Sequence, residues 1–182
     1  MLTIGTFAVA LIHSTCIAYD QGAPLPVSTE VTAPANRPVT LTLSAGSRMG
    51  NDSREPDTTA TGLTLGFRLN ARVVGPWSAS VDYTGDRDLA SASHLSTPLG
   101  TLTLGVQWFP VSILYLRGAA GASIVGHNRP DEGVYRTAVG AVGLDLPASS
   151  HLSLNIEVAG TAIRLPESHW NALSFRLGLT WY

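Results

Sequence analysis

From Pro38 to the C-terminus, apolar side chains alternate with polar or small ones in eight successive segments. A period of two is that of a β-strand, whose neighbouring side chains point to opposite faces. The segments are residues 39–47, 62–73, 77–85, 99–109, 113–125, 134–146, 152–163 and 172–182. Each has the length with which a tilted strand crosses a bilayer, about nine to thirteen residues. The alternation therefore predicts an all-β chain.

The connections between these segments alternate in length. The second, fourth and sixth are short, at residues 74–76, 110–112 and 147–150, whereas the others are longer and polar. Short turns at one rim and long loops at the other are typical of outer-membrane barrels, with the turns in the periplasm. Residues 38–182 are therefore predicted to form an eight-stranded antiparallel up-and-down transmembrane β-barrel.

The two faces of the segments differ in composition. One face carries Leu, Phe and Val, and the other is mostly Gly, Ser, Thr and Ala. Every charge in the middle of a segment lies on the second face, namely Arg68, Arg72, Asp82, Arg117, Asp145, Glu157 and Arg176. Because an eight-stranded lumen is narrow, the small face is expected inside and the bulky face in lipid. The charges then form an ionic network that plugs the lumen, in which Arg176 is expected to pair with Glu157 on the neighbouring segment.

Two alternatives to a plugged membrane barrel stay open. A soluble barrel would turn its apolar face inward and its charges outward. An open barrel would use the inward charges as a gated path for ions or small solutes.

Charged residues are only 13% of the chain, and mean hydropathy is +0.18. All basic residues are arginine and the net charge is −2, so no basic surface indicates a nucleic-acid partner.

The first 18 residues differ from the rest of the chain. They are uncharged, apolar through Ile12, and end with Cys16 and Ala18 at the −3 and −1 positions of a cleavage site. Residues 1–18 are predicted to be a secretory signal peptide, and the Pro-rich residues 19–37 a flexible periplasmic leader. The alternative is an uncleaved anchor or a buried N-terminal helix.

Aromatic residues gather where the short turns are expected. Trp77 opens the third segment, Trp108 lies near the end of the fourth, and Trp181 and Tyr182 end the chain. Such residues form the interfacial belt of a membrane barrel.

The C-terminal segment LSFRLGLTWY, together with the strand pattern, resembles the small eight-stranded outer-membrane barrels of the OmpA/OmpX type. This resemblance covers residues 38–182. It implies insertion by the barrel-assembly machinery into the outer membrane of a Gram-negative bacterium, with lipid and lipopolysaccharide as partners. It does not fix an activity, since the family includes anchors, adhesins, small channels and lipid-modifying enzymes.

No catalytic constellation stands out. His94 and Ser96, like His151 and Ser153, are two residues apart, but neither pair has a third group that would orient the base. His127, His169 and the acids Asp131, Glu132 and Glu167 are expected on external loops, without the spacing of a metal site. We therefore expect no enzyme, no cofactor and no bound metal.

The expected role is structural or surface-interacting. External loops with both charge signs would form the contact surface for an extracellular ligand. Their charged residues are Arg54, Glu55, Asp57, Asp86, Arg87, Asp88, Arg129, Asp131 and Glu132.

Overall fold

The computed structural model describes residues 37–54, 56–57, 59–88, 98–126 and 133–182. The predicted signal peptide and almost all of the predicted leader lie outside the described residues. No helix within the described part of the chain is long and apolar enough to cross a membrane.

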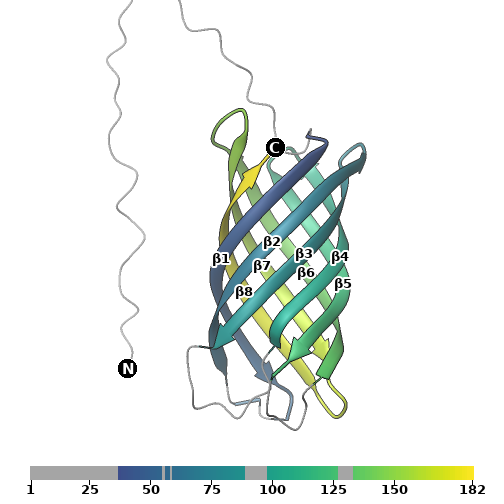
Figure 1. Cartoon of the computed structure of the whole chain (residues 1–182), viewed down its shortest axis with the longest axis vertical. Helices are drawn as coiled ribbons and strands as arrows, with labels where there is room; N and C mark the ends of the chain where they lie inside the picture. Colours follow the sequence, from purple (N-terminus) through teal and green to yellow (C-terminus); the bar gives the residue numbers. More distant parts are fainter. Residues whose placement is uncertain (1–36, 55, 58, 89–97, 127–132) are drawn as a thin grey trace, which may run out of the picture.

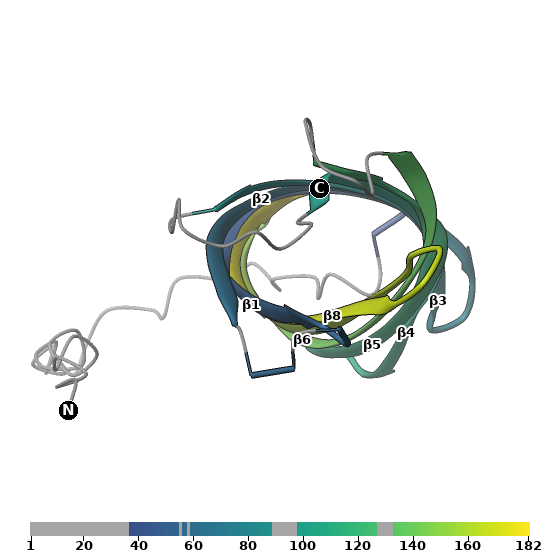
Figure 2. The same cartoon turned by 90° about the horizontal axis from the view of Figure 1, so that it is seen from below.

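The described residues form β-strands joined in chain order. The strands are β1 (Val39–Asp52), β2 (Ala60–Val74), β3 (Trp77–Asp88), β4 (Pro98–Val111), β5 (Leu114–Val125), β6 (Gly133–Pro147), β7 (Leu152–Arg164) and β8 (His169–Trp181). Each strand pairs antiparallel with the next, and β8 pairs with β1, for example through Leu43 and Leu179. The sheet is therefore a closed antiparallel barrel, seen from the side in Figure 1 and along its axis in Figure 2.

The two ends of the barrel are named here by their connections. At the turn rim, β2–β3, β4–β5 and β6–β7 are joined by residues 75–76, 112–113 and 148–151, and the chain ends there (Figure 1). Gly75 has φ +51°, a left-handed conformation that glycine adopts without a Cβ clash, which allows the shortest of these turns. The loop rim is the opposite end, where β1–β2 and β7–β8 are joined by residues 53–59 and 165–168.

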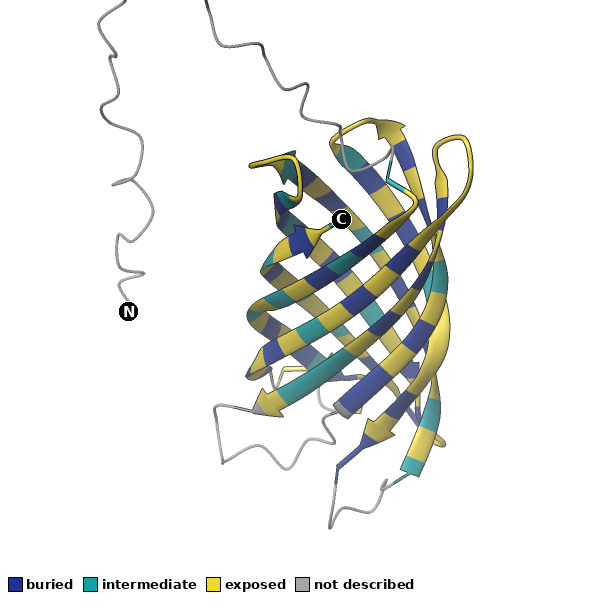
Figure 3. Ribbon diagram, turned by 45° about the horizontal axis from the view of Figure 1, so that its top comes forward, coloured by how far each residue is buried: buried dark blue, intermediate teal, exposed yellow. Residues whose placement is uncertain are grey.

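The apolar face of each strand points outward. Leu65 and Leu104 on the outer wall are 66% and 65% exposed, whereas Arg68 and Arg117 inside are each 4% exposed. Figure 3 shows the resulting alternation of buried and exposed residues along the strands. This is the reverse of a soluble barrel, in which leucines fill the interior and arginines contact water.

Several strands extend farther toward the loop rim than the sequence pattern predicts. Asp86, Arg87 and Asp88 were expected in an external loop, but they belong to β3. His169 was also expected in a loop and is the first residue of β8. The pairing β1–β2 continues to Gly50 and Ala60, and β1–β8 continues to Asp52 and Trp170. Continued ladder hydrogen bonds satisfy backbone groups that a loop would leave to water.

Candidate functional site

A cluster of charges crosses the middle of the lumen. This central ionic cluster consists of Arg68, Asp82, Tyr115, Arg117, Glu157 and Arg176, all buried. Its members come from β2, β3, β5, β7 and β8. Arg68 lies directly opposite Asp82 in the β2–β3 pairing, and Glu157 lies opposite Arg176 in the β7–β8 pairing. The strand register therefore places opposite charges side by side.

Glu157 is the centre of this cluster because it contacts three guanidinium groups. Its Oε2 lies 2.5 Å from Arg68 Nη2, and its Oε1 lies 3.2 Å from Arg117 Nη2. Arg176 Nη2 also donates to Oε1, the neighbouring-strand pair expected from the sequence. Since both oxygens accept charge-assisted hydrogen bonds, this carboxylate ties three strands to β7.

Asp82 is the second acid of the cluster. Its Oδ2 accepts a hydrogen bond from Arg68 Nε at 2.8 Å and lies 3.6 Å from Arg117 Nη1. Its Oδ1 lies 3.7 Å from Arg176 Nη1. Three arginines thus share two carboxylates, which leaves one positive charge in the cluster.

Tyr115 fills the space beside Arg68 and Glu157. Its hydroxyl donates to Glu157 Oε2 at 2.8 Å and accepts from Arg68 Nη1 at 3.2 Å. Its ring lies 5.9 Å from that of Phe109, and it is fully buried. Gly143 stands directly opposite on β6, where a methyl group would lie within 2.7 Å of ring atom Cε1. The missing side chain at Gly143 makes room for the ring.

A second ion pair closes the lumen nearer the loop rim. Arg48 Nη1 lies 3.0 Å from Asp86 Oδ2, and both side chains are at most 5% exposed. The Arg48 guanidinium stacks over Trp170, 4.9 Å from its ring centroid. A cation over the face of an indole is attracted by the ring quadrupole. Asp86, expected on a contact loop, therefore belongs to the interior.

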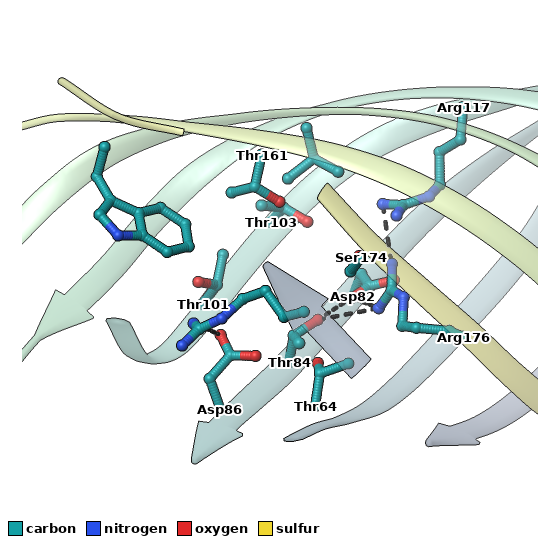
Figure 4. Close-up of a pocket in the computed structure, with 13 residues that line it drawn as sticks. Thr64, Asp82, Thr84, Asp86, Thr101, Thr103, Arg117, Thr161, Ser174 and Arg176 are labelled. Atoms are coloured by element: carbon teal, nitrogen blue, oxygen red, sulfur yellow. Dashed lines mark hydrogen bonds and ion pairs between the residues drawn. The ribbon is translucent and has the colours of Figure 1, made fainter. Parts of the chain in front are cut away.

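A cavity of about 30 Å³ separates this pair from the central ionic cluster. Its lining includes Arg48, Asp82, Asp86, Arg117 and Arg176, and Figure 4 shows most of these side chains converging on it. This volume is roughly that of one water molecule in the liquid. Between the Arg48–Asp86 pair and the central ionic cluster, the described side chains therefore leave a space of about the size of one water molecule.

Two of the seven charges expected in the lumen network lie apart from the central cluster. Asp145 is buried near the turn rim, where the Ser153 hydroxyl donates to it. Arg72 was predicted inside, but it is exposed at the turn rim and its Nε donates to the Gly75 carbonyl at 3.0 Å. That prediction was wrong because Arg72 lies at the end of β2, where the register shifts between Arg72 and Val74 and the side chain reaches the surface.

The four predicted belt aromatics lie at the turn rim. Trp77 and Trp108 are cross-strand partners that stack 5.9 Å apart on the outer wall. Trp181 is also exposed, whereas the Tyr182 ring lies under the Arg37 guanidinium at 5.1 Å. Burial raises the pKa of the Tyr182 phenol above its ordinary value of 10.0. Tyr182 therefore packs against a cation, whereas the three tryptophans are exposed on the outer wall.

The candidate catalytic pairs do not assemble within the described residues. His151 is exposed in the β6–β7 turn, while the Ser153 hydroxyl points inward to Asp145. His94 and Ser96 lie outside the described residues, as do His127, Asp131 and Glu132. No group of three His, Cys, Asp or Glu side chains that could hold a metal occurs in the described part of the chain.

Sequence reasoning missed Tyr115 and Trp170, two fully buried aromatic residues of the lumen. Tyr115 precedes Arg117 by two residues, and Trp170 precedes Arg176 by six, so each shares the inward face of its strand. Extending the alternation past the charged residue would have found both.

Comparison with solved structures places this architecture among known barrels. No protein-family model matches the chain, and no curated protein sequence matches it significantly. Neisserial surface protein A superposes with a TM-score of 0.61 at 13% identity, covering 80% of this chain and 97% of its own. The chain has the fold of the small eight-stranded outer-membrane β-barrels.

A second solved barrel agrees with this assignment. Ail, the attachment invasion locus protein of Yersinia pestis, gives a TM-score of 0.52 at 12% identity, covering 78% of this chain and 97% of Ail. Another Ail structure, in complex with the heparin analogue sucrose octasulfate, gives 0.53 at 13% identity, covering 79% of this chain and 99% of Ail. At such identities the likeness concerns the barrel fold and not the residues of its lumen.

Proposed function

We propose that this chain is an integral outer-membrane β-barrel with a sealed lumen and a structural or surface-interaction role. The observation that carries the proposal is the inversion of the barrel, with leucines exposed and paired charges buried. An apolar outer wall of this extent is costly in water and favourable in lipid. Lipid and lipopolysaccharide are then its surroundings, and the signal peptide and the barrel-assembly machinery bring it there.

The sealed lumen favours a non-transporting and non-enzymatic role. The central ionic cluster and the Arg48–Asp86 pair cross the interior at two levels. Ions would have to break several charge-assisted hydrogen bonds to pass, since an eight-stranded lumen has no room beside them. The connections of the loop rim are the proposed contact surface, where Arg54 and Asp57 are exposed. The similar structures named for surface location and attachment support such a role.

Conductance in a planar bilayer tests this proposal. We expect the refolded protein to give no steady channel under conditions in which a wide porin, prepared in the same way, conducts. We also expect the lipid A mass spectrum of cells that express the protein to stay unchanged. Large, steady channels would contradict the sealed lumen, and a lipid A species that depends on expression would contradict the non-enzymatic role.

A further inference from the structure

The outer wall of β5, β6 and β7 has one flat area. Glycines lie side by side across the three strands, with Gly118 opposite Gly140 and Gly140 opposite Gly160. The next row toward the loop rim is alanine throughout, formed by Ala120, Ala138 and Ala162. All six residues are exposed, and we call them the flat patch.

The barrel itself does not require this flatness. A Cβ built on Gly118 or Gly140 would meet no atom within 4 Å. The adjoining row toward the turn rim is bulky, with Leu116, Val142 and Val158 in the same register. The flat patch is thus an apolar recess beside a bulky row of the same three strands.

Cationic side chains border this recess at the loop rim. Arg136 on β6 and Arg164 on β7 lie side by side, one residue beyond the last pair of these strands, Thr137 and Ile163. On the other side of Arg164, His169 lies opposite it on β8. All three are exposed and line a shallow hollow of about 300 Å³, together with Ala138, Ala162 and Asn171. No described side chain forms an ion pair with either arginine.

The acids of the described strands lie elsewhere. Those whose side chains are described all point inward, namely Asp52, Asp82, Asp86, Asp145 and Glu157. Glu167 is exposed in the β7–β8 connection near this border. The outer wall at the border therefore has an excess of positive charge directly beside an apolar recess.

We propose that the flat patch and its cationic border bind one anionic lipid of the outer leaflet. The two guanidinium groups take the phosphate of its headgroup, and an acyl chain lies in the recess. Guanidinium groups match phosphate oxygens in charge and bidentate geometry, and a flat recess gives a chain close contact along its length. The proposal rests on the membrane location proposed above.

A second copy of this chain fits the surface less well. Two copies inserted in the same direction and joined at the flat patch would bring Arg136 and Arg164 of both copies to the same height. Like charges at that distance oppose association. A lipid phosphate instead neutralises them.

Native mass spectrometry of the folded barrel, titrated with diphosphorylated lipid A, tests the site. The variant R136Q/R164Q should weaken binding about tenfold or more, because two charge-assisted hydrogen-bonding groups are lost. G140L should weaken it as well by filling the recess. The matched controls R72Q, at the turn rim, and A45L, on the outer wall of β1, should change affinity less than about twofold.

The other outcomes separate the possibilities. Equal affinities of all variants in a correctly inserted barrel would overturn this inference. Inorganic phosphate that binds as tightly as lipid A would also overturn it, because the site would then accept any anion. A wild-type dimer that G140L converts to monomer would overturn it too, because the flat patch would then be an interface between two copies. Failure of the wild type to insert into phosphatidylcholine nanodiscs would contradict the proposed membrane location instead.

Discussion

Replacing Glu157 by Gln is expected to lower the free energy of unfolding by about 3–5 kcal/mol, the usual cost of breaking a buried ion pair. Gln keeps the shape of the side chain but removes the charge that offsets Arg68, Arg117 and Arg176. Asp82 would then face three buried guanidinium groups alone. Urea unfolding of the barrel folded in lipid vesicles, followed by tryptophan fluorescence, measures the change.

The matched control for this prediction is Glu167→Gln, because Glu167 is exposed in the β7–β8 connection. This change should stay within about 0.5 kcal/mol. The double variant E157Q/R176Q should lose less than the sum of its two single changes, since it removes an arginine together with the acid that Arg176 contacts. Additive losses, or equal losses for E157Q and E167Q, would show that Glu157 does not hold the cluster together.

Replacing Tyr115 by Ala is expected to cost about 3–5 kcal/mol, because a fully buried ring leaves a cavity. Arg68 and Glu157 also lose their shared hydroxyl partner. Y115F keeps the ring and should lose less, about 1–3 kcal/mol, because Glu157 and Arg68 each lose a hydrogen bond to the hydroxyl but keep their other partners. The same vesicle assay gives both values.

Gly143 supplies a sharper test of the Tyr115 packing. G143A should destabilise the wild type, since its methyl group would collide with the Tyr115 ring. In the Y115A background the same change should be neutral or stabilising, because the methyl group enters the vacated space. If G143A has the same effect in both backgrounds, the two residues do not pack as described.

The barrel and the orientation of its faces could be predicted from sequence because a β-strand has a period of two and an eight-stranded lumen is narrow. A position such as Leu104 or Arg117 can only point in or out, so composition decides which side it takes. The Glu157–Arg176 pair could be expected because the two residues have opposite charges and lie on the polar face of neighbouring strands. These inferences need only local periodicity.

The contacts of the ionic network could not be predicted without the register of every strand pair. Arg68 and Glu157 are 89 residues apart and meet across the lumen, a contact that no periodicity contains. The sequence pattern also predicts the strand ends wrongly: it places polar residues such as Asp86 in loops, whereas Asp86 pairs with Arg48 inside the barrel. Arg72 was placed inside by alternation alone, whereas the irregular end of β2 exposes it.

Spin-label accessibility along one strand tests the inverted barrel most directly. Single cysteines at Leu102, Thr103 and Leu104 would be labelled in a chain with Cys16 replaced by Ser, folded in vesicles. We expect labels at Leu102 and Leu104 to relax with lipid-soluble oxygen and not with an aqueous nickel chelate. The label at Thr103, which is buried beside Asp82, should respond weakly to both. Strong relaxation of the two leucine positions by the nickel chelate would place them in water and contradict the membrane barrel.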